Sequence, residues 1–503
     1  MAGSVNPDRS EWDVVVVGGG PAGQTAALYA TRFSGLDAVV VESERVGGDC
    51  HFWACIPSKA MLSPVHQLSA GQDVAGVKEL VTDRHLDVPS VLRRRDAAND
   101  HLDDGDQVAG MLRAGVDVLR GRGGLSGERT VVVRDADGRE RTITARHAVV
   151  LATGSLPRIP PVPGLREARP WFSRDATNIH EVPDRVLVLG GGPVACEAVT
   201  WLRAFGARNI TVVERSPRLL ARAEPFVGDA LLAGFRGAGV DVRLEQRVER
   251  VERAEVNDAG PGLIHGGPIM VRLDGGDVLT VDEVLVAAGR VSAGVDLGLQ
   301  TVGLAAGEFL STDRHMAVKD VPGQWLYAVG DVGGPALMTH MGKYQARVAG
   351  EVIAARAAGR PLDTEPFNRH TDAVRPGRVP QVIFTDPEVA MVGLTEQAAR
   401  EQGFDVEVVE SDFGDVDGAF LAQDTYHGRA KLVVDARADV IIGATFMGIG
   451  MAEMLHAATA AVVAATPIPT LWHAVPSFPT VSEVWLRLLE ALDEARQRQL
   501  VAA

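Results

Sequence analysis

Cysteine is scarce in this chain, and its scarcity limits the kinds of site that the sequence can build. Only three of the 503 residues are cysteine. A structural zinc site needs about four ligands, and beside the close pair Cys50 and Cys55 the nearest extra candidate is His51. Two close cysteines in a chain without a secretion signal are more often redox-active or metal-binding than structural. With so few ligands at hand, we interpret the pair as redox-active thiols.

Long hydrophobic runs and an excess of positive charge are also absent. The longest apolar stretch, the alanine- and valine-rich segment 457–465, is too short to span a bilayer and is typical of a buried helix. Residues 1–12 lack the apolar segment of a signal peptide. The formal net charge of −16 gives no long-range attraction to nucleic acid or anionic membranes, and we interpret the basic run 93–95 as a solvated helix face. We therefore expect a cytoplasmic protein that binds neither nucleic acid nor membranes.

Glycine, in contrast, is abundant, and one glycine-rich segment follows a buried strand. The apolar run 13–17 leads directly into Gly18, Gly20 and Gly23, then into a segment of helical spacing, and a second strand ends in Glu42. In such a strand-turn-helix unit the glycines let the backbone approach a pyrophosphate at the helix N-terminus. The acidic residue about twenty positions on accepts hydrogen bonds from a ribose. The segment therefore predicts a dinucleotide site.

The same order of features returns later in the chain. A strand at 185–189 leads into Gly190, Gly192 and Ala195, and the next strand ends in Glu214. Two complete units predict two bound nucleotides, or one cofactor and one nucleotide substrate.

Three further strands end in turns where a ligand would bind. The strand beginning at Ala148 ends in Thr153 and Gly154, and the strand beginning at Val284 ends in Gly289. A third strand delivers Asp331 at its C-terminal end, and ligands bind at that end of a parallel sheet.

From about residue 365 the pattern changes to short strands and two alanine-rich helices. This change predicts an α+β terminal part. The fold class is therefore α/β, with two nucleotide-binding Rossmann-like domains and a C-terminal α+β domain.

Taken in order, these motifs resemble the flavin-dependent pyridine nucleotide-disulfide oxidoreductases, which include dihydrolipoamide dehydrogenase, glutathione reductase and mercuric reductase. The resemblance rests on the two glycine fingerprints and four other segments, 50–59, 152–154, 327–331 and 478–483. It implies a homodimer whose chain has three domains. Residues 1–160 and 290–364 would form the FAD-binding domain, residues 161–289 the NAD(P)-binding domain, and residues 365–503 the dimerisation domain.

The resemblance also implies roles for individual residues. Cys50 would be the exchange thiol, and Cys55, at a helix start that lowers its pKa, would be the thiolate facing the flavin. Lys59 and Glu197 would pair beside the flavin ring and tune its potential, although a purely structural ion pair is the alternative. Cys196 we interpret as a small buried residue. The cofactor-binding residues would be Gly18, Gly20, Gly23, Glu42, Thr153, Gly154, Gly190, Gly192, Glu214, Gly289, Asp331 and His340.

The sequence features that distinguish NADH from NADPH point in both directions. Glu214 favours the free ribose hydroxyl of NADH, whereas Arg215 and Arg218 would suit the extra phosphate of NADPH. Ala195 in place of a third glycine also leans to NADPH within the family. We favour NADH.

One departure from the family pattern lies in the terminal motif. The position of the acid–base histidine is Phe478, while the glutamate that orients it in the family remains as Glu483. The phenylalanine side chain can neither donate nor accept a proton. Acid–base catalysis, which contributes about 10²- to 10⁴-fold in rate, has therefore lost its usual residue. Either another residue substitutes, with His473 the nearest candidate, or the acceptor needs no proton relay. Mercuric reductases share this loss, but the paired cysteines that handle mercury are not seen here.

We therefore expect an FAD enzyme that takes electrons from NADH or NADPH and passes them through the Cys50–Cys55 pair to a small-molecule acceptor. The acceptor would be a small disulfide, a quinone or a metal ion. Two alternatives stay open: a quinone reductase or diaphorase that does not use the cysteines, and a redox sensor without turnover.

Overall fold

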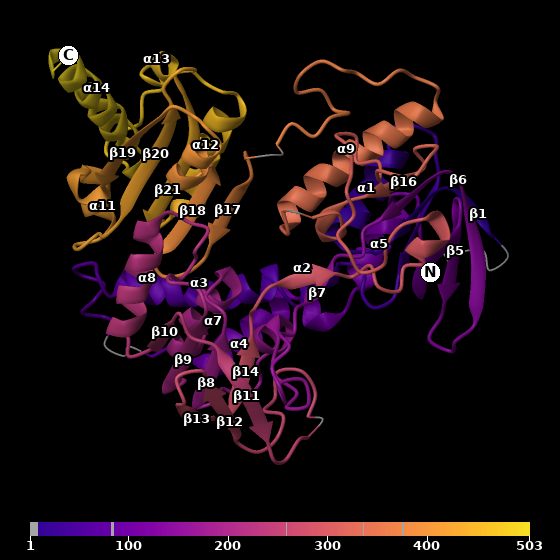
Figure 1. Ribbon diagram of the computed structural model, residues 1–503, viewed down its shortest axis with the longest axis horizontal. Coiled ribbons are helices and arrows are strands. Elements are labelled where there is room, and N and C mark those ends of the chain that lie inside the picture. The colour runs from indigo at the N-terminus through magenta and orange to yellow at the C-terminus, as the bar shows by residue number, and fades with distance from the viewer. Residues whose placement is uncertain (1–8, 82–84, 258, 335, 375–376, 503) are drawn as a thin grey trace. The chain divides into compact units, whose positions relative to one another are not determined.

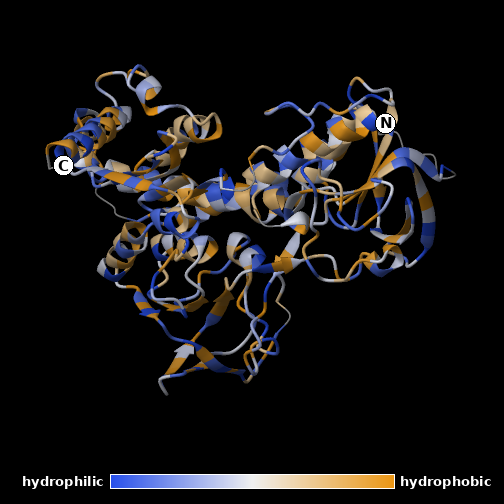
Figure 2. Ribbon diagram, turned by 45° about the horizontal axis from the view of Figure 1, so that its top comes forward, coloured by the Kyte–Doolittle hydropathy of each residue, from blue (hydrophilic) through white to orange (hydrophobic). Residues whose placement is uncertain are grey.

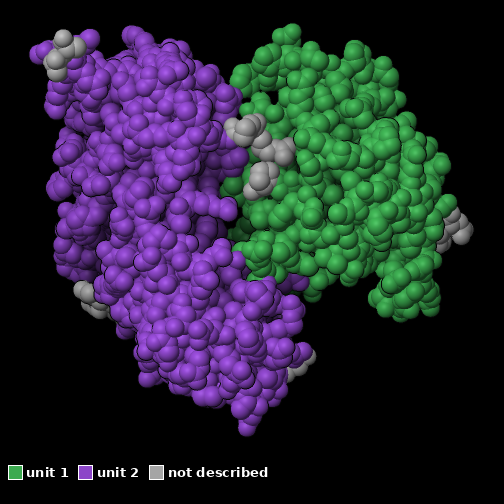
Figure 3. All heavy atoms as spheres, viewed as in Figure 1, with its two compact units in different colours: residues 1–57, 96–158, 289–373 green, residues 58–95, 159–288, 374–503 purple. Residues whose placement is uncertain are grey.

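The computed structural model describes residues 9–81, 85–257, 259–334, 336–374 and 377–502 (Figure 1). The chain forms two compact units, drawn in green and purple in Figure 3. Unit 1 comprises residues 1–57, 96–158 and 289–373, and unit 2 comprises 58–95, 159–288 and 374–503. Most of the segment 1–12, expected to contain no signal peptide, lies outside the described residues. Among the described helices none is long and apolar enough to cross a membrane. The division into three domains stays a prediction.

Unit 1 is built on a parallel sheet that continues into an antiparallel meander. Its strand order is β3-β2-β1-β6-β5-β4, with β16 also paired to β6. The central strands read as continuous runs of valine because both faces of the sheet are buried. The strands are β1 (Glu11–Val17), β2 (Ala38–Glu42), β3 (Val116–Arg120), β4 (Arg122–Gly127), β5 (Thr130–Arg134), β6 (Glu140–Leu151) and β16 (Leu326–Ala328).

The helices of unit 1 include a closely packed pair, α1 (Pro21–Thr31) and α9 (Thr339–Ala357). A Cβ atom on Gly350 would lie 2.5 Å from the Cβ of Tyr29, so glycine is what allows this approach. The remaining elements are α2 (Gly48–Phe52), η1 (Asp100–Leu102), α5 (Gly105–Arg113), the ribbon of β7 (Ser155–Pro157) and β15 (Arg290–Ser292), η2 (Leu299–Val302) and η3 (Gly330–Gly333). The helix α3 (Cys55–Gly71) begins in unit 1 and continues in unit 2.

Unit 2 contains a second parallel sheet, of order β10-β9-β8-β14, and a small antiparallel sheet, β11-β12-β13. The parallel strands are β8 (Arg185–Leu189), β9 (Asn209–Glu214), β10 (Asp241–Leu244) and β14 (Glu283–Val286). The antiparallel strands are β11 (Val248–Arg253), β12 (Ile269–Leu273) and β13 (Val278–Val281). The helices of this part are α4 (Val88–Ala98), α6 (Ser173–Thr177), α7 (Pro193–Ala204) and α8 (Pro225–Gly237).

The C-terminal part of unit 2 is an antiparallel sheet with helices, as the change of pattern near residue 365 predicts. The sheet has the order β17-β18-β21-β20-β19. The apolar stretch 457–465 falls mostly within α12, whose buried residues include Ala458, Ala461 and Val462. Figure 2 shows hydrophobic and hydrophilic residues mixed along the chain. The elements are β17 (Pro380–Ile383), β18 (Glu388–Gly393), α10 (Glu396–Glu401), β19 (Val406–Asp412), η4 (Phe413–Asp415), α11 (Asp417–Ala422), β20 (Arg429–Asp435), β21 (Val440–Gly448), α12 (Met451–Val463), α13 (Ile468–Leu471), η5 (Val481–Glu483) and α14 (Val484–Ala502).

The basic run on α4 is a solvated face only in part. Arg93 and Arg94 are exposed, but Arg95 is fully buried. Its guanidinium donates hydrogen bonds to the carbonyl oxygens of Thr177 (2.7 Å) and Ile179 (3.3 Å). The interpretation was wrong for Arg95, because these acceptors come from a distant segment and leave no local signal in the sequence.

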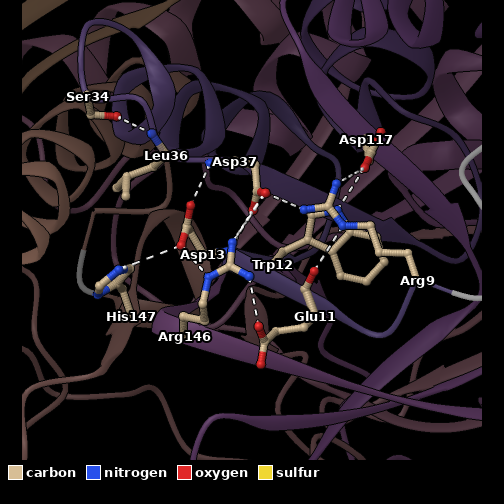
Figure 4. A network of polar contacts seen from close by, with 10 residues as sticks. All are labelled: Arg9, Glu11, Trp12, Asp13, Ser34, Leu36, Asp37, Asp117, Arg146 and His147. Carbon is tan, nitrogen blue, oxygen red and sulfur yellow. Dashed lines mark hydrogen bonds and ion pairs between the residues drawn. The ribbon is translucent and has the colours of Figure 1, made fainter.

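A network of polar contacts fixes the start of β1 (Figure 4). The Asp13 carboxylate accepts hydrogen bonds from Arg146 Nε (2.6 Å) and from the backbone N–H of Asp37 (2.9 Å). Asp37 in turn accepts the N–H of Asp13 (2.7 Å), and the indole of Trp12 donates to Asp117 (2.7 Å). The network joins β1 to residues that precede β2 and to β3 and β6.

This network should make stability depend on pH through Asp13. Burial alone would raise the pKa of Asp13, but the bonds from Arg146 and the Asp37 N–H outweigh it and lower the pKa below the usual 3.8. A carboxyl group with a lowered folded pKa stabilises the fold above its unfolded pKa, and this contribution is lost as the pH falls through the folded pKa. Thermal melts should therefore show Asp13→Asn below the wild type at pH 7, with the gap closing below about pH 4. A gap that is the same at pH 7 and pH 3 would contradict this account.

Candidate active site

The first glycine turn joins β1 to α1 and leaves open space at the start of the helix. Gly18 has a φ of +105°, and a Cβ there would lie 2.4 Å from the carbonyl oxygen of Ala152. At Gly23 a Cβ would lie 1.9 Å from the Gly18 oxygen, whereas at Gly20 it would meet nothing within 4 Å. Gly18 and Gly23 are therefore needed for close packing, and Gly20 faces the room that a pyrophosphate requires.

Glu42 ends β2 beside this turn, as the sequence predicts. Its carboxylate accepts the backbone N–H groups of Gly19 (2.6 Å) and Glu44 (2.7 Å). Burial raises the pKa of Glu42, and these two hydrogen bonds act in the opposite direction. The carboxylate is thus held at the strand end where an adenosine ribose is expected.

The turn after β6 contains a buried polar atom without a protein partner. Thr153 Oγ1 has no hydrogen-bond partner in the part of the chain that the structure describes. Gly154 follows with a φ of +76°, and a Cβ there would meet nothing within 4 Å. Buried polar atoms are nearly always satisfied in complete structures, so the Thr153 hydroxyl fits a site that holds a polar cofactor.

Asp331 lies in η3 and is held by two residues that the sequence analysis did not identify. Ser155 Oγ donates to Asp331 Oδ2 (2.5 Å), and Arg290 Nε donates to Ser155 Oγ (2.6 Å). Arg290 also donates to Asp49 Oδ2 (3.2 Å), next to Cys50. Burial raises the pKa of Asp331, while the Ser155 bond and the Arg290 charge lower it. The one available signal was that Ser155 and Arg290 follow Gly154 and Gly289 directly.

The two close cysteines lie at adjoining helices. Cys50 is in α2, and Cys55 is the first residue of α3, as the sequence predicts. Both are half-buried, and all three cysteines of the chain are thiols in this structure. Cys55 Sγ lies 3.4 Å from Thr339 Oγ1, and the next residue of α9, His340, is exposed. A helix start is a position at which a thiolate at Cys55 would be favoured.

Cys196, by contrast, is fully buried in α7, and burial raises the pKa of its thiol. It is the small buried residue that the sequence predicts, and it has no thiolate character.

The second glycine turn, in unit 2, repeats the geometry of the first. Gly190 has a φ of +119°, and a Cβ there would lie 2.5 Å from the Ala287 oxygen. The Glu214 carboxylate accepts the N–H groups of Gly191 (2.6 Å) and Ser216 (2.7 Å). A Cβ on Gly192 would meet nothing within 4 Å. The repeat in the sequence is therefore also a repeat in structure.

Lys59 and Glu197 pair within unit 2, as the sequence predicts. Lys59 Nζ lies 2.8 Å from Glu197 Oε2 and 4.7 Å from the ring centroid of Phe384. The other carboxylate oxygen accepts the N–H of Phe384 (3.0 Å). Glu197 thus fixes both the lysine and the start of the segment after β17.

The terminal motif carries two of the residues that the sequence analysis weighed, Phe478 and His473, at the surface of the chain. Phe478 is 71% exposed, and His473 is also exposed. Glu483 Oε1 pairs with Arg487 (3.0 Å), and its buried Oε2 has no hydrogen-bond partner among the described residues. Within one chain Glu483 therefore pairs with an arginine.

Comparisons with known proteins identify the family of this chain. Residues 12–354 match the pyridine nucleotide-disulphide oxidoreductase family, and residues 379–489 match the pyridine nucleotide-disulphide oxidoreductase dimerisation domain. A dihydrolipoyl dehydrogenase of Chlorobaculum tepidum is 32% identical over 480 residues, which cover 94% of this chain and 95% of that protein. A dihydrolipoyl dehydrogenase of Thermus scotoductus is 31% identical over 491 residues, covering 96% and 97%.

Solved structures share the fold. The HOCl-induced flavoprotein disulfide reductase RclA of Escherichia coli, in its Cu(II) complex, aligns with a TM-score of 0.79 at 23% identity, covering 95% of this chain and 99% of that one. LpdA of Mycobacterium tuberculosis aligns with a TM-score of 0.79 at 22% identity, covering 96% and 99%.

Proposed function

Because the chain belongs to the pyridine nucleotide-disulphide oxidoreductases, a family of FAD-dependent enzymes that use a pyridine nucleotide, we propose that it is an NADH-dependent reductase of small disulfides. The observation that carries the proposal is the placement of Cys50 and Cys55 at adjoining helices, with Cys55 at a helix start beside the Thr339 hydroxyl. A quinone or a metal ion is the alternative acceptor.

The residues of unit 1 fit FAD. Gly18, Gly20 and the start of α1 would hold its pyrophosphate, and Glu42 its adenosine ribose. Asp331, oriented by Ser155, would hold the ribityl chain, and the Thr153 hydroxyl would gain a partner. FAD, when bound, supplies the two-electron step between the nicotinamide and the thiols.

In unit 2 the second glycine turn would hold the nicotinamide nucleotide. The Glu214 carboxylate stands at the strand end with both oxygens held by backbone N–H groups, where it would accept the free ribose hydroxyls of NADH. Arg215 is exposed beside it, so NADPH is the alternative.

An anaerobic titration with NADH tests the use of the cysteines. We expect uptake of two electrons with a long-wavelength absorbance band, because a thiolate at Cys55 would lie against the flavin. Simple bleaching of the flavin without this band would mean that the cysteines do not communicate with it, and would favour the diaphorase alternative.

We also expect a homodimer in solution, because residues 379–489 match a dimerisation domain. Exposed apolar side chains in this part include Phe420, Val475 and Phe478, which an interface would cover. Light scattering should give twice the chain mass of 53.3 kDa. A monomer would contradict this and would also remove any role of Glu483 across an interface.

A further inference from the structure

One arginine of unit 1 is linked both to the aspartate that would hold the flavin and to the helix that carries Cys50. Arg290, the first residue of β15, donates from Nε to Ser155 Oγ (2.6 Å) and from Nη2 to the Ser155 carbonyl oxygen (2.6 Å). The same Nη2 donates to Asp49 Oδ2 (3.2 Å), in the first turn of α2. These three residues come from distant parts of the chain, and all belong to unit 1.

The link through Ser155 ends at Asp331. Ser155 Oγ accepts a hydrogen bond from Arg290 and donates its own proton to Asp331 Oδ2 (2.5 Å). Arg290 Nε itself lies 3.9 Å from the same carboxylate oxygen. Burial raises the pKa of Asp331, the Ser155 bond and the Arg290 charge lower it, and the Asp49 charge raises it. Arg290 therefore keeps together two carboxylates that would repel each other without it.

The link through Asp49 holds the start of α2. This helix has only five residues, and its N-cap, Gly47, offers no side chain to cap it. Helices shorter than about 12 residues are marginal by themselves, so the position of α2 depends on its contacts. Its later residues are tied to the turn at η1, where His51 Nε2 lies 2.8 Å from Asp100 Oδ2 and Asn99 donates to the Phe52 carbonyl oxygen (3.2 Å). Arg290 supplies the contact at its first turn.

The guanidinium group suits this double contact better than an ammonium group would. The planar fork presents several N–H groups in fixed directions, and here Nε and Nη2 are used at the same time. The Arg290 side chain is 24% exposed, so solvent screens these contacts less than it screens a surface pair.

We propose that Arg290 is a positioning residue that orients Asp331 for the flavin through Ser155 and fixes the start of α2 through Asp49. One side chain then sets both the flavin site and the helix of the exchange thiol. The inference rests on the proposed function and deepens it, because it adds a residue that acts on both parts of the proposed redox site.

The test uses two measurements on the holoenzyme. The first is the rate at which FAD leaves the protein after dilution, followed by the rise in flavin fluorescence. The second is hydrogen exchange of the peptide 47–54, which covers α2, followed by mass spectrometry with FAD in excess. Arg290→Met should raise both rates about tenfold or more, because a hydrogen bond to a charged group is worth at least about that factor.

Single variants separate the two links. Ser155→Ala should speed FAD release alone, because the Ser155 carbonyl oxygen still holds Nη2 of Arg290 near Asp49. Asp49→Ala should speed exchange in α2 alone. Arg290→Lys keeps the charge but has one nitrogen in place of the fork, so it should restore at most one of the two rates.

Arg122→Met is the matched control, because Arg122 pairs with Asp296 in unit 1 at 2.9 Å and both side chains are 66% exposed. It should leave both rates at the wild-type level. Thermal melts check that each variant is folded, and if Arg290→Met is not, Ser155→Ala and Asp49→Ala decide the matter.

Several outcomes would overturn the role of Arg290. They are a change in neither or only one of the rates in Arg290→Met, full recovery of both rates in Arg290→Lys, and equal effects of Ser155→Ala and Asp49→Ala on both rates. The two measurements involve no electron acceptor. A wild type that reduces no disulfide would therefore overturn the proposed acceptor and leave the role of Arg290 to be decided by FAD release and exchange.

Discussion

Replacing Cys50 with serine should lower NADH-driven disulfide reduction by roughly 10³-fold or more, since losing a catalytic nucleophile has cost an enzyme up to about 10⁶ in rate. Cys50 lies in α2, five residues before Cys55, which begins α3. The residue before Cys50 is Asp49, whose carboxylate pairs with Arg290. A serine hydroxyl is a poor nucleophile at neutral pH and cannot form a mixed disulfide. Steady-state NADH consumption with oxidised lipoamide measures the loss.

Two controls make this prediction specific. Cys196→Ser carries the same chemical change in a fully buried helix, and it should leave turnover unchanged because this thiol is inert. Quinone reduction by Cys50→Ser should persist, because that reaction can proceed from the flavin alone. If disulfide reduction survives in Cys50→Ser, Cys50 is not the exchange thiol and the proposed route through the cysteines is wrong.

Replacing Glu283 with alanine should lower the free energy of unfolding by about 3–5 kcal/mol, the range found when one partner of a buried ion pair is removed. Glu283, at the start of β14, pairs with Arg253 at the end of β11, and both side chains are fully buried. The distance from Arg253 Nη2 to Glu283 Oε2 is 2.8 Å. Glu283 also accepts the backbone N–H groups of His265 and Val284. The alanine variant would leave the buried guanidinium without its counter-charge, and urea unfolding followed by circular dichroism measures the effect.

The control for this prediction is an exposed pair on the same strand. Glu252, next to Arg253, pairs with Arg250 at the surface, and Glu252→Ala should cost no more than about 1 kcal/mol. Combining Arg253→Met with Glu283→Leu should recover most of the loss, because burial raises the pKa of Glu283 and the charged pair has little net advantage over apolar packing. Equal losses in Glu283→Ala and Glu252→Ala would refute the buried-pair account.

The parts of the site that the sequence predicts are those written in local patterns. Gly18 and Gly190 follow apolar strands at the spacing that a dinucleotide turn demands, and Glu42 and Glu214 end the next strands. The start of α3 at Cys55 is marked by Pro57, because a proline is tolerated in the first turn of a helix, where no helical hydrogen bond is lost. Each of these depends on neighbours within about thirty residues.

The parts that the sequence does not predict depend on distant segments. Arg95 is buried because Thr177 and Ile179 supply acceptors. Asp100 reaches His51 only because a turn of non-glycine residues adopts positive φ, for which the sequence has no signal. Burial and rare backbone conformations are properties of the whole fold, so periodicity cannot show them.

The buried Thr153 hydroxyl, which has no hydrogen-bond partner among the described residues, leads us to expect that a bound flavin would stabilise the folded protein. A buried hydroxyl with no partner costs free energy that a bound ligand would recover. A ligand that binds the folded state alone raises its stability with the logarithm of the free ligand concentration. The amount of folded enzyme in a cell would then follow the supply of flavin, so a shortage of the vitamin from which flavin is made would lower the level of the protein as well as its activity.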